Sequence, residues 1–262
     1  MEKLARCRYD VNISRPTATN KFIEIMKNCF YIILLFIGQF SFGQNSKKIE
    51  IPLYANKDTS LWYKNYSKLQ KELKFTNLIE STDTFRFRFW THNQALVVWS
   101  NDKNKYFASV TSFAQRYDKK LLKKNSYVID KVFFKTKTLD SLTAKNIFQQ
   151  IESLKILGIP TDEKIKGWNQ GLDGVEYLIE TSDIKNYSFK EYWAPYIFAD
   201  KLNEAKRIQQ FVNYIFNDLK IREYYDKLKL PNGTYLTNGT PGITIRTITE
   251  STIGARNITD LL

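Results

Sequence analysis

Alternating apolar and polar residues predict a series of β-strands from residue 85 onward. Residues 85–90 (FRFRFW) alternate strictly, which places three phenylalanines on one face of a strand and two arginines with Trp90 on the other. Further strands are expected at residues 95–99, 105–117, 127–137, 174–181, 186–193 and 242–248. Short polar turns separate several of these segments, so the pattern favours hairpins and antiparallel pairing.

Apolar residues at helical spacing predict three amphipathic helices between and after these strands. The first helix runs from a cap at Thr59 or Ser60 to about residue 74. The second covers about residues 141–157 after a cap at Asp140 or Ser141 and is expected to end at Gly158. The third begins at a cap at Asp200 and continues to about residue 220.

The order of these elements indicates the α+β class, because hairpin-connected strands are interrupted by helices rather than alternating with them. An antiparallel sheet needs only one covered face. We therefore expect an antiparallel sheet with two or three amphipathic helices packed on one face. A β-rich tail, rich in Gly, Thr and Asn, follows from about residue 231.

An export signal is predicted at residues 26–43. A short basic start is followed by the apolar run 29–38, and small residues stand three and one positions before Gln44. The apolar run has about half of the ~20 residues that a stable membrane-spanning helix needs. We therefore expect cleavage before Gln44 and a periplasmic or extracellular protein. Residues 1–25 are interpreted as an upstream extension, and the alternative is a cytoplasmic tail on an uncleaved anchor.

The predicted mature chain is a single exported domain at residues 44–262, without a transmembrane helix. Its 219 residues are enough for one sizeable core. Both cysteines, Cys7 and Cys29, precede Gln44, so this part has no disulfide, thiol nucleophile or cysteine–metal site. We expect no cofactor.

The chain is basic, with a formal net charge of +13. Residues 1–43 hold six Lys/Arg and three Asp/Glu, which leaves +10 for residues 44–262. Such a balance favours anionic partners, namely an acidic polymer, a lipid surface or nucleic acid. Because the lysines are dispersed, with a local cluster at 119–124, a solvated lysine-rich surface is the simpler explanation of the charge. No specific nucleic-acid motif is present.

Arg86, Arg88 and Trp90 form the first candidate site, because they share the face opposite the phenylalanines of their strand. Guanidinium groups beside an indole ring suit an anionic or aromatic ligand. The alternative is structural, because a second covered face of the sheet would bury Trp90 as well.

Asp173, Glu176 and Glu180 form the second candidate site. Glu176 and Glu180 lie on the same face of a predicted strand, and Asp173 opens it. Paired carboxylates are typical of glycoside hydrolysis and of hard metal ions. The simpler interpretation is a turn aspartate followed by the solvated face of a strand.

Catalytic signatures are otherwise missing from the sequence. His92 is the single histidine, which excludes multi-histidine metal sites, and no metal site is predicted. A nucleophile elbow and a glycine-rich phosphate loop are also absent. We therefore expect a non-enzymatic binding or envelope-interaction protein whose partner is an envelope protein or an anionic polymer. The alternatives are a carboxylate-dependent hydrolase and a binder of anionic surfaces.

Overall fold

The computed structural model describes residues 47–53, 58–91, 93–102, 105–117, 129–171, 174–237 and 244–248. Contacts divide the chain into two units, Met1–Ser46 and Lys47–Leu262, and every described residue belongs to the second. The predicted extension at 1–25 and the predicted signal at 26–43 lie outside the described residues.

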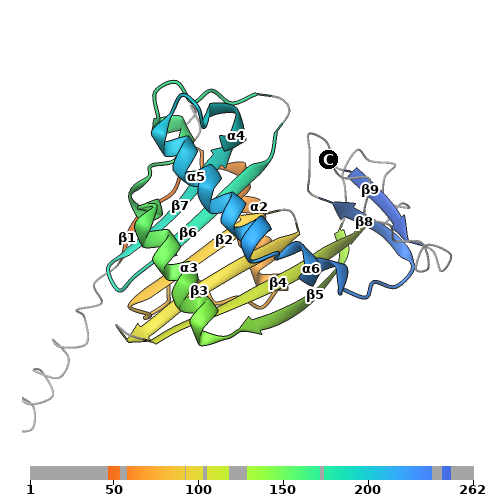
Figure 1. Ribbon diagram of the computed structural model, residues 1–262. Helices are drawn as coiled ribbons and strands as arrows, with labels where there is room; N and C mark the ends of the chain where they lie inside the picture. The colour runs from red at the N-terminus through yellow and green to blue at the C-terminus, as the bar shows by residue number, and fades with distance from the viewer. Residues whose placement is uncertain are drawn as a thin grey trace, which may run out of the picture. The chain divides into compact units, whose positions relative to one another are not determined.

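The described strands form one nine-stranded sheet in the order β1-β7-β6-β2-β3-β4-β8-β9, with β5 paired to β4 (Figure 1). The strands are β1 (Lys48–Glu50), β2 (Phe85–Thr91), β3 (Gln94–Asp102), β4 (Lys105–Tyr117), β5 (Ile129–Leu139), β6 (Glu176–Ser182), β7 (Asn186–Trp193), β8 (Gly233–Thr237) and β9 (Thr244–Ile248). All pairs are antiparallel except the short β1, which runs parallel to β7. The sheet is therefore mixed but mostly antiparallel, and the predicted α+β fold is confirmed.

Five α-helices lie among the described residues, namely α2 (Leu61–Glu72), α3 (Ser141–Ser153), α4 (Pro195–Phe198), α5 (Asn203–Asn213) and α6 (Arg222–Asp226). Two begin at the residues that the sequence indicates. The Ser60 hydroxyl accepts the amide hydrogens of Trp62 and Tyr63 at the start of α2, and the Asp140 carboxylate accepts that of Thr143 at the start of α3. Each cap satisfies amide groups that have no partner within the helix.

The two long C-terminal helices differ from the prediction at their ends. Helix α3 stops at Ser153 rather than near Gly158, because Lys155 adopts a left-handed conformation with φ of 51° and turns the chain into a 3-10 segment at Ile156–Gly158. Helix α5 begins at Asn203 rather than at Asp200, which lies in the turn after α4. Its apolar stripe continues through the π-helical segment Tyr214–Asp218.

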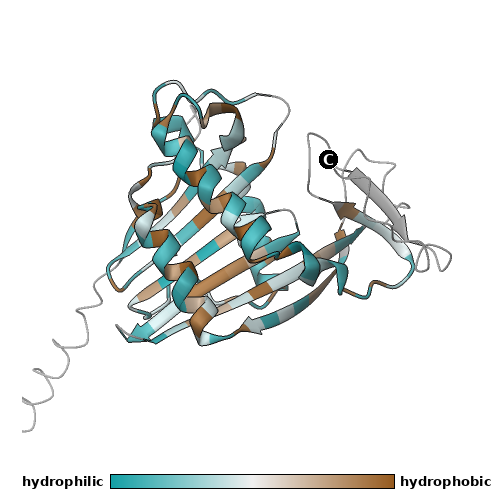
Figure 2. Ribbon diagram, in the orientation of Figure 1, coloured by the Kyte–Doolittle hydropathy of each residue, from teal (hydrophilic) through white to brown (hydrophobic). Residues whose placement is uncertain are grey.

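Helices α3 and α5 pack on one face of the sheet. Figure 1 shows both crossing the central strands, and Figure 2 shows hydrophilic residues on their outer sides. Phe87 and Phe89 of β2 meet Phe211 of α5 edge to face, with ring centroids 5.6 and 5.5 Å apart. Ile147 and Ile151 of α3 belong to the same buried cluster. This face holds the larger apolar core.

Helix α2 packs on the opposite face, where it covers β6, β7 and part of β2. Its Tyr66 contacts Trp90 with ring centroids 4.8 Å apart. Leu178 of β6 and Phe189 of β7 complete the second buried cluster together with Leu69. Ala95 of β3 and Phe113 of β4 still belong to this cluster. Farther along the same face of these strands, past the end of α2 at Glu72, the side chains of Val97, Trp99, Ser109 and Thr111 are not covered by the helix. A pocket opens there.

Candidate functional site

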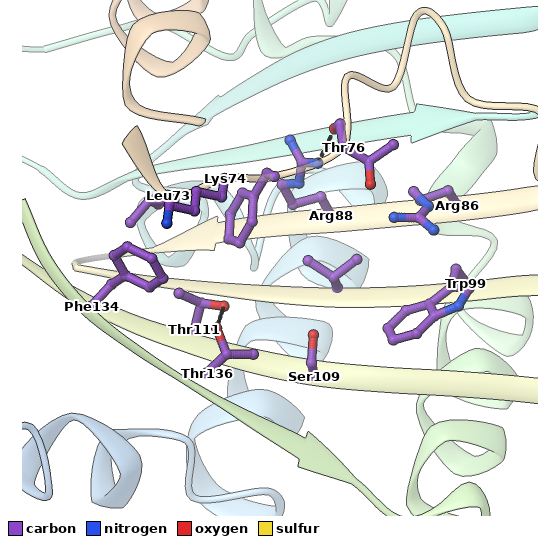
Figure 3. Close-up of a pocket in the computed structure, with 12 residues that line it drawn as sticks. Leu73, Lys74, Thr76, Arg86, Arg88, Trp99, Ser109, Thr111, Phe134 and Thr136 are labelled. Atoms are coloured by element: carbon purple, nitrogen blue, oxygen red, sulfur yellow. Dashed lines mark hydrogen bonds between the residues drawn. The ribbon is translucent and has the colours of Figure 1, made fainter. Parts of the chain in front are cut away.

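The candidate site is a pocket of about 330 Å³ on the α2 face of the sheet. It begins where the chain leaves α2 and extends across β2, β3, β4 and β5 (Figure 3). A volume of this size suits a small molecule, because ligand pockets of proteins start at about 300 Å³. Its cationic lining residues are Lys74, Arg86 and Arg88. Its apolar lining residues are Leu73, Phe75, Val97, Trp99 and Phe134. Its hydroxyl-bearing lining residues are Thr76, Ser109, Thr111 and Thr136.

Arg86 lines this pocket with a guanidinium group that has only some of its hydrogen-bond donors occupied. Its Nε donates to the Oδ2 atom of Asp83 at 2.5 Å, and its Cζ lies 5.3 Å from the centre of the Trp99 ring. None of the described residues accepts a hydrogen bond from Nη1 or Nη2 of Arg86. Cross-strand register explains the position, because Arg86 of β2 stands directly opposite Trp99 of β3. The two terminal nitrogens are therefore available to an anionic group.

Arg88 is held much more firmly, with 1% of its surface exposed. Its Nη1 donates to Glu180 Oε2 at 2.7 Å and to Gln70 Oε1 at 2.9 Å, and its Nη2 donates to the Thr76 carbonyl at 2.9 Å. Its guanidinium also lies over the Phe75 ring, 4.7 Å from the centroid. Burial lowers the pKa of Arg88 from its ordinary value, and the charge of Glu180 opposes this shift. The residue fixes one wall of the pocket.

Glu180 is the centre of this buried polar network. Besides Arg88, the indole Nε1 of Trp90 donates to its Oε2 at 3.1 Å, and the Tyr187 hydroxyl donates to its Oε1 at 3.0 Å. A buried charge is tolerated when it is paired and hydrogen-bonded, as it is here. The network joins β2, β6 and β7 beneath α2 and is structural in character.

Hydroxyl groups line the other side of the pocket, on β4 and β5. Thr111 and Thr136 stand opposite each other in the register, and their Oγ1 atoms are 2.8 Å apart. Figure 3 shows this pair beside Ser109, with Phe134 at the edge of the group. Phe134 is 37% exposed, which is unusual for a phenylalanine on a strand. Between the hydroxyl side and the arginine side lie the apolar side chains of β3.

The first candidate site of the sequence is therefore divided by the structure. Arg86 and Arg88 line the pocket, whereas Trp90 is 1% exposed and packs between Tyr66, Phe75 and Phe113. Arg88 and Trp90 consequently do not form an exposed strip. Helix α2 provides the second covered face that was the structural alternative for Trp90.

Of the second candidate site, the structure describes Glu176 and Glu180, and it gives them different surroundings. Glu180 is paired with Arg88, and Asp173 lies outside the described residues, as do His92 and the lysine cluster at 119–124. The solvated strand face that the sequence suggested is absent here, because Glu180 is buried. The physical reason is again α2, which removes this face of β6 from water.

Glu176 instead belongs with two acidic residues that the sequence analysis missed, Asp162 and Glu191. Burial, and then the neighbouring charge of Asp162, raises the pKa of Glu176 to about 9. Burial raises the pKa of Glu191 to about 7, although a hydrogen bond from Ser60 opposes the shift. Oε1 of Glu176 and Oδ1 of Asp162 are buried without a hydrogen-bond partner among the described residues. Within the same residues, no group of three acidic, His or Cys side chains is arranged to hold a metal ion.

A signal for Glu191 is present in the sequence. It occupies the same alternate positions of β7 as Tyr187 and Phe189, so a charged residue stands where the pattern predicts a buried apolar one. Trp99 was missed for another reason. Its partnership with Arg86 depends on the pairing register of two strands, which alternation alone does not fix.

Comparisons of the chain with models of protein families, with curated proteins and with solved structures found no match. Of the helices that the structure describes, none is both long and apolar enough to cross a membrane.

Proposed function

We propose that the protein is an exported, non-enzymatic binding domain whose pocket over β2–β5 takes a small anionic ligand with an apolar part. The observation that carries the proposal is Arg86, whose two free terminal nitrogens lie beside the Trp99 ring in a pocket of about 330 Å³. A guanidinium group pairs with carboxylate oxygens through parallel hydrogen bonds, and the apolar side chains of β3 offer surface for the rest of the ligand.

The state of Glu180 favours binding over carboxylate catalysis. Arg88, Trp90 and Tyr187 together occupy both of its oxygen atoms. A general acid or base must exchange a proton with a substrate, and a carboxylate that is enclosed in this way has no free position for that exchange. Of the acidic residues of β6, Glu180 thus belongs to a structural ion pair, and Glu176 belongs to the separate buried group with Asp162 and Glu191.

The beginning of the folded unit supports the export part of the proposal. Lys47 lies three residues after Gln44, and its Nζ donates to the carbonyl of Leu78 at 3.0 Å and to Oγ of Ser182 at 2.6 Å. Removal of residues 1–43 would leave these contacts intact. N-terminal sequencing of the protein from its native host should find Gln44 or its cyclised form. An N-terminus at Met1 in the soluble cytoplasm would contradict export.

Binding is tested by titrating simple anions against the fluorescence of the protein, because Trp99 lines the pocket. A carboxylate with an apolar ring, such as benzoate, should bind more tightly than the matched alcohol, benzyl alcohol. Arg86→Gln should weaken the binding of the carboxylate about tenfold. Arg222→Gln is the matched control, because Arg222 also lies over an aromatic ring, Phe216 at 4.6 Å, but outside the pocket. Equal losses from both variants would contradict the proposal.

A carboxylate-dependent hydrolase remains the second candidate, and it now rests on Glu176 rather than on Glu180. A pKa of about 9 keeps Glu176 protonated at neutral pH, which is the state that a general acid requires. Chromogenic glycosides provide the test. Turnover that Glu176→Gln abolishes and Arg86→Gln leaves unchanged would favour the hydrolase over the binding domain.

A further inference from the structure

We infer that the ligand of the pocket is a short acidic saccharide, which presents its carboxylate to Arg86 and its hydroxyl groups to β4 and β5. This inference rests on the proposed binding function and narrows it to one chemical class. Three properties of the described lining carry it: the net charge of the pocket, the side on which hydroxyl groups gather, and the position of the indole ring.

The net charge of the pocket matches a single carboxylate. Two of its three cations already have acidic partners, because Arg86 pairs with Asp83 at 2.5 Å and Arg88 pairs with Glu180 at 2.7 Å. Lys74 is the third cation, and it is exposed to water. Among the described lining residues none is Asp or Glu. The site therefore offers about one uncompensated positive charge, which suits a monoanion better than a doubly charged phosphate group.

The hydroxyl groups of the pocket suit a ligand that itself carries hydroxyl groups. When Thr111 and Thr136 bond to each other, one of the two protons is used and the other is left to donate, and both oxygens keep acceptor capacity. Ser109 adds a further donor and acceptor on the same side. A sugar hydroxyl also donates and accepts at one atom, so it can satisfy such a group in either sense. A flat aromatic carboxylate would leave the remaining proton of the threonine pair and the Ser109 hydroxyl without a partner in the bound state.

The indole of Trp99 lies between the two polar sides. Trp99 stacks on Phe107, with centroids 5.5 Å apart and planes inclined by 18°, and it lies under the Arg86 guanidinium. Adjacent strands are ~4.8 Å apart, so β2, which carries Arg86, lies ~14 Å from β5. This distance suits two or three sugar rings, whose C–H faces pack against an aromatic ring while their edges form hydrogen bonds.

The inference is tested by comparing ligands that differ by one group. Glucuronate and galacturonate are titrated beside glucose and galactose, and benzoate and inorganic phosphate represent the other two chemistries. We expect each uronate to bind at least about tenfold more tightly than its neutral sugar. Binding of the uronates should also exceed that of benzoate and of phosphate. Di- and trisaccharides of the uronates then measure the length of the site.

Two variants separate the two ends of the ligand. Arg86→Gln should remove the preference for uronate over neutral sugar. The control variant, Arg222→Gln, should keep that preference. Thr136→Val, which keeps the shape of the side chain, should weaken the binding of the uronate di- and trisaccharides about tenfold and leave benzoate binding unchanged. An equal effect of Thr136→Val on both ligands would overturn the hydroxyl contact that the inference assigns.

The failure of this inference can be told apart from failure of the binding function. If benzoate or phosphate binds in an Arg86-dependent manner and the uronates do not, the saccharide inference is overturned while the binding proposal stands. If none of these anions binds with dependence on Arg86, both are overturned.

Discussion

The two faces of the sheet are formed by the same strands, but their side chains differ in polarity. Beneath α3 and α5, alternate residues of β2, β3 and β4 such as Phe87, Val98 and Val110 are fully buried and apolar. Beneath α2, the intervening residues of the same strands include Arg88, and β6 contributes Glu180. One face is closed by two helices, and the other is closed by one short helix and then opens into the pocket.

This difference separates stability from function. An apolar face needs complete cover, because every exposed apolar group weakens the fold. The α2 face can remain partly open because the pocket beyond the helix is lined by cationic and hydroxyl-bearing side chains as well as apolar ones. Beyond the end of α2 at Glu72, Arg86, Trp99 and the two threonines line the pocket for which we propose a ligand.

The largest effect is expected from a charge on the closed face. Ile151→Asp in α3 buries an unpaired carboxylate and should lower the free energy of unfolding by about 4 kcal/mol or more, as measured by urea denaturation. Leu142→Asp is the control in the same helix, because Leu142 is 67% exposed. If Ile151→Asp unfolds at the same urea concentration as the parent protein, the α3 face is not the core and the contrast between the two faces is wrong.

The next effect concerns the ion pair on the α2 face. Glu180→Gln leaves the Arg88 charge buried without its counter-charge and should destabilise the protein by about 3 kcal/mol. The double variant Arg88→Met with Glu180→Leu should recover most of that loss, because an apolar pair needs no counter-charge. A double-mutant cycle measures the coupling, and simple additivity of the two single losses would show that the pair is not a unit.

Stability should also respond to pH through the acidic group on the α2 face. Burial raises the pKa of Glu176 to about 9 and that of Glu191 to about 7, both above the ordinary 4.5. The folded state then holds protons that the unfolded state has released, so stability falls as pH rises from about 5 toward these values. Each group contributes a slope of up to about 1.4 kcal/mol per pH unit.

Glu176→Gln should flatten this dependence and stabilise the protein at pH 8 by about 2 kcal/mol, because an amide does not ionise. Denaturation curves at pH 6, 7 and 8 measure it, with Glu152→Gln on the exposed side of α3 as the control. A curve with an unchanged slope for Glu176→Gln would place the titrating group elsewhere.

The smallest effect compares the two helix caps. Ser60→Ala removes the cap of α2 and also the hydroxyl that donates to Glu191, so it should cost about 1.5 kcal/mol. Asp140→Ala removes the solvent-exposed cap of α3 and should cost about 0.5 kcal/mol. Thermal melts of both variants give the ranking, and the reverse order would mean that α3 depends more on its cap than α2 does.

Local patterns of the sequence were sufficient for most of the fold. The alternation at 85–90 placed Phe87 and Trp90 on opposite faces, and the structure buries each under a different helix. The cap at Asp140 fixed the start of α3. The parallel pairing of β1 was not predicted, because three residues carry too little pattern to select a partner 138 positions away.

The candidate site was harder to predict from the sequence than the fold was, because the site depends on which strands are neighbours in the sheet. Arg88 and Glu180 were assigned to two separate sites, yet they stand opposite each other where β2 pairs with β6. The amphipathic pattern of α2 showed that one side of the helix is buried but not which face of the sheet it covers. The position of α2 on this face buries Trp90 and leaves the pocket open beside the helix.

The contacts made by the first described residues also bear on the order in which the two faces form. Helix α3 follows β5 directly in the chain, so its contacts with β4 need only short loops to close. In contrast, the pairing of β1 with β7, the bond from Lys47 to Ser182 and the bond from Ser60 to Glu191 join residues 131 to 138 positions apart. During synthesis the contacts of α3 with β4 can therefore form while β1 is still unpaired, and β1, although it is made before every other described strand, finds its partner only when β7 has been made.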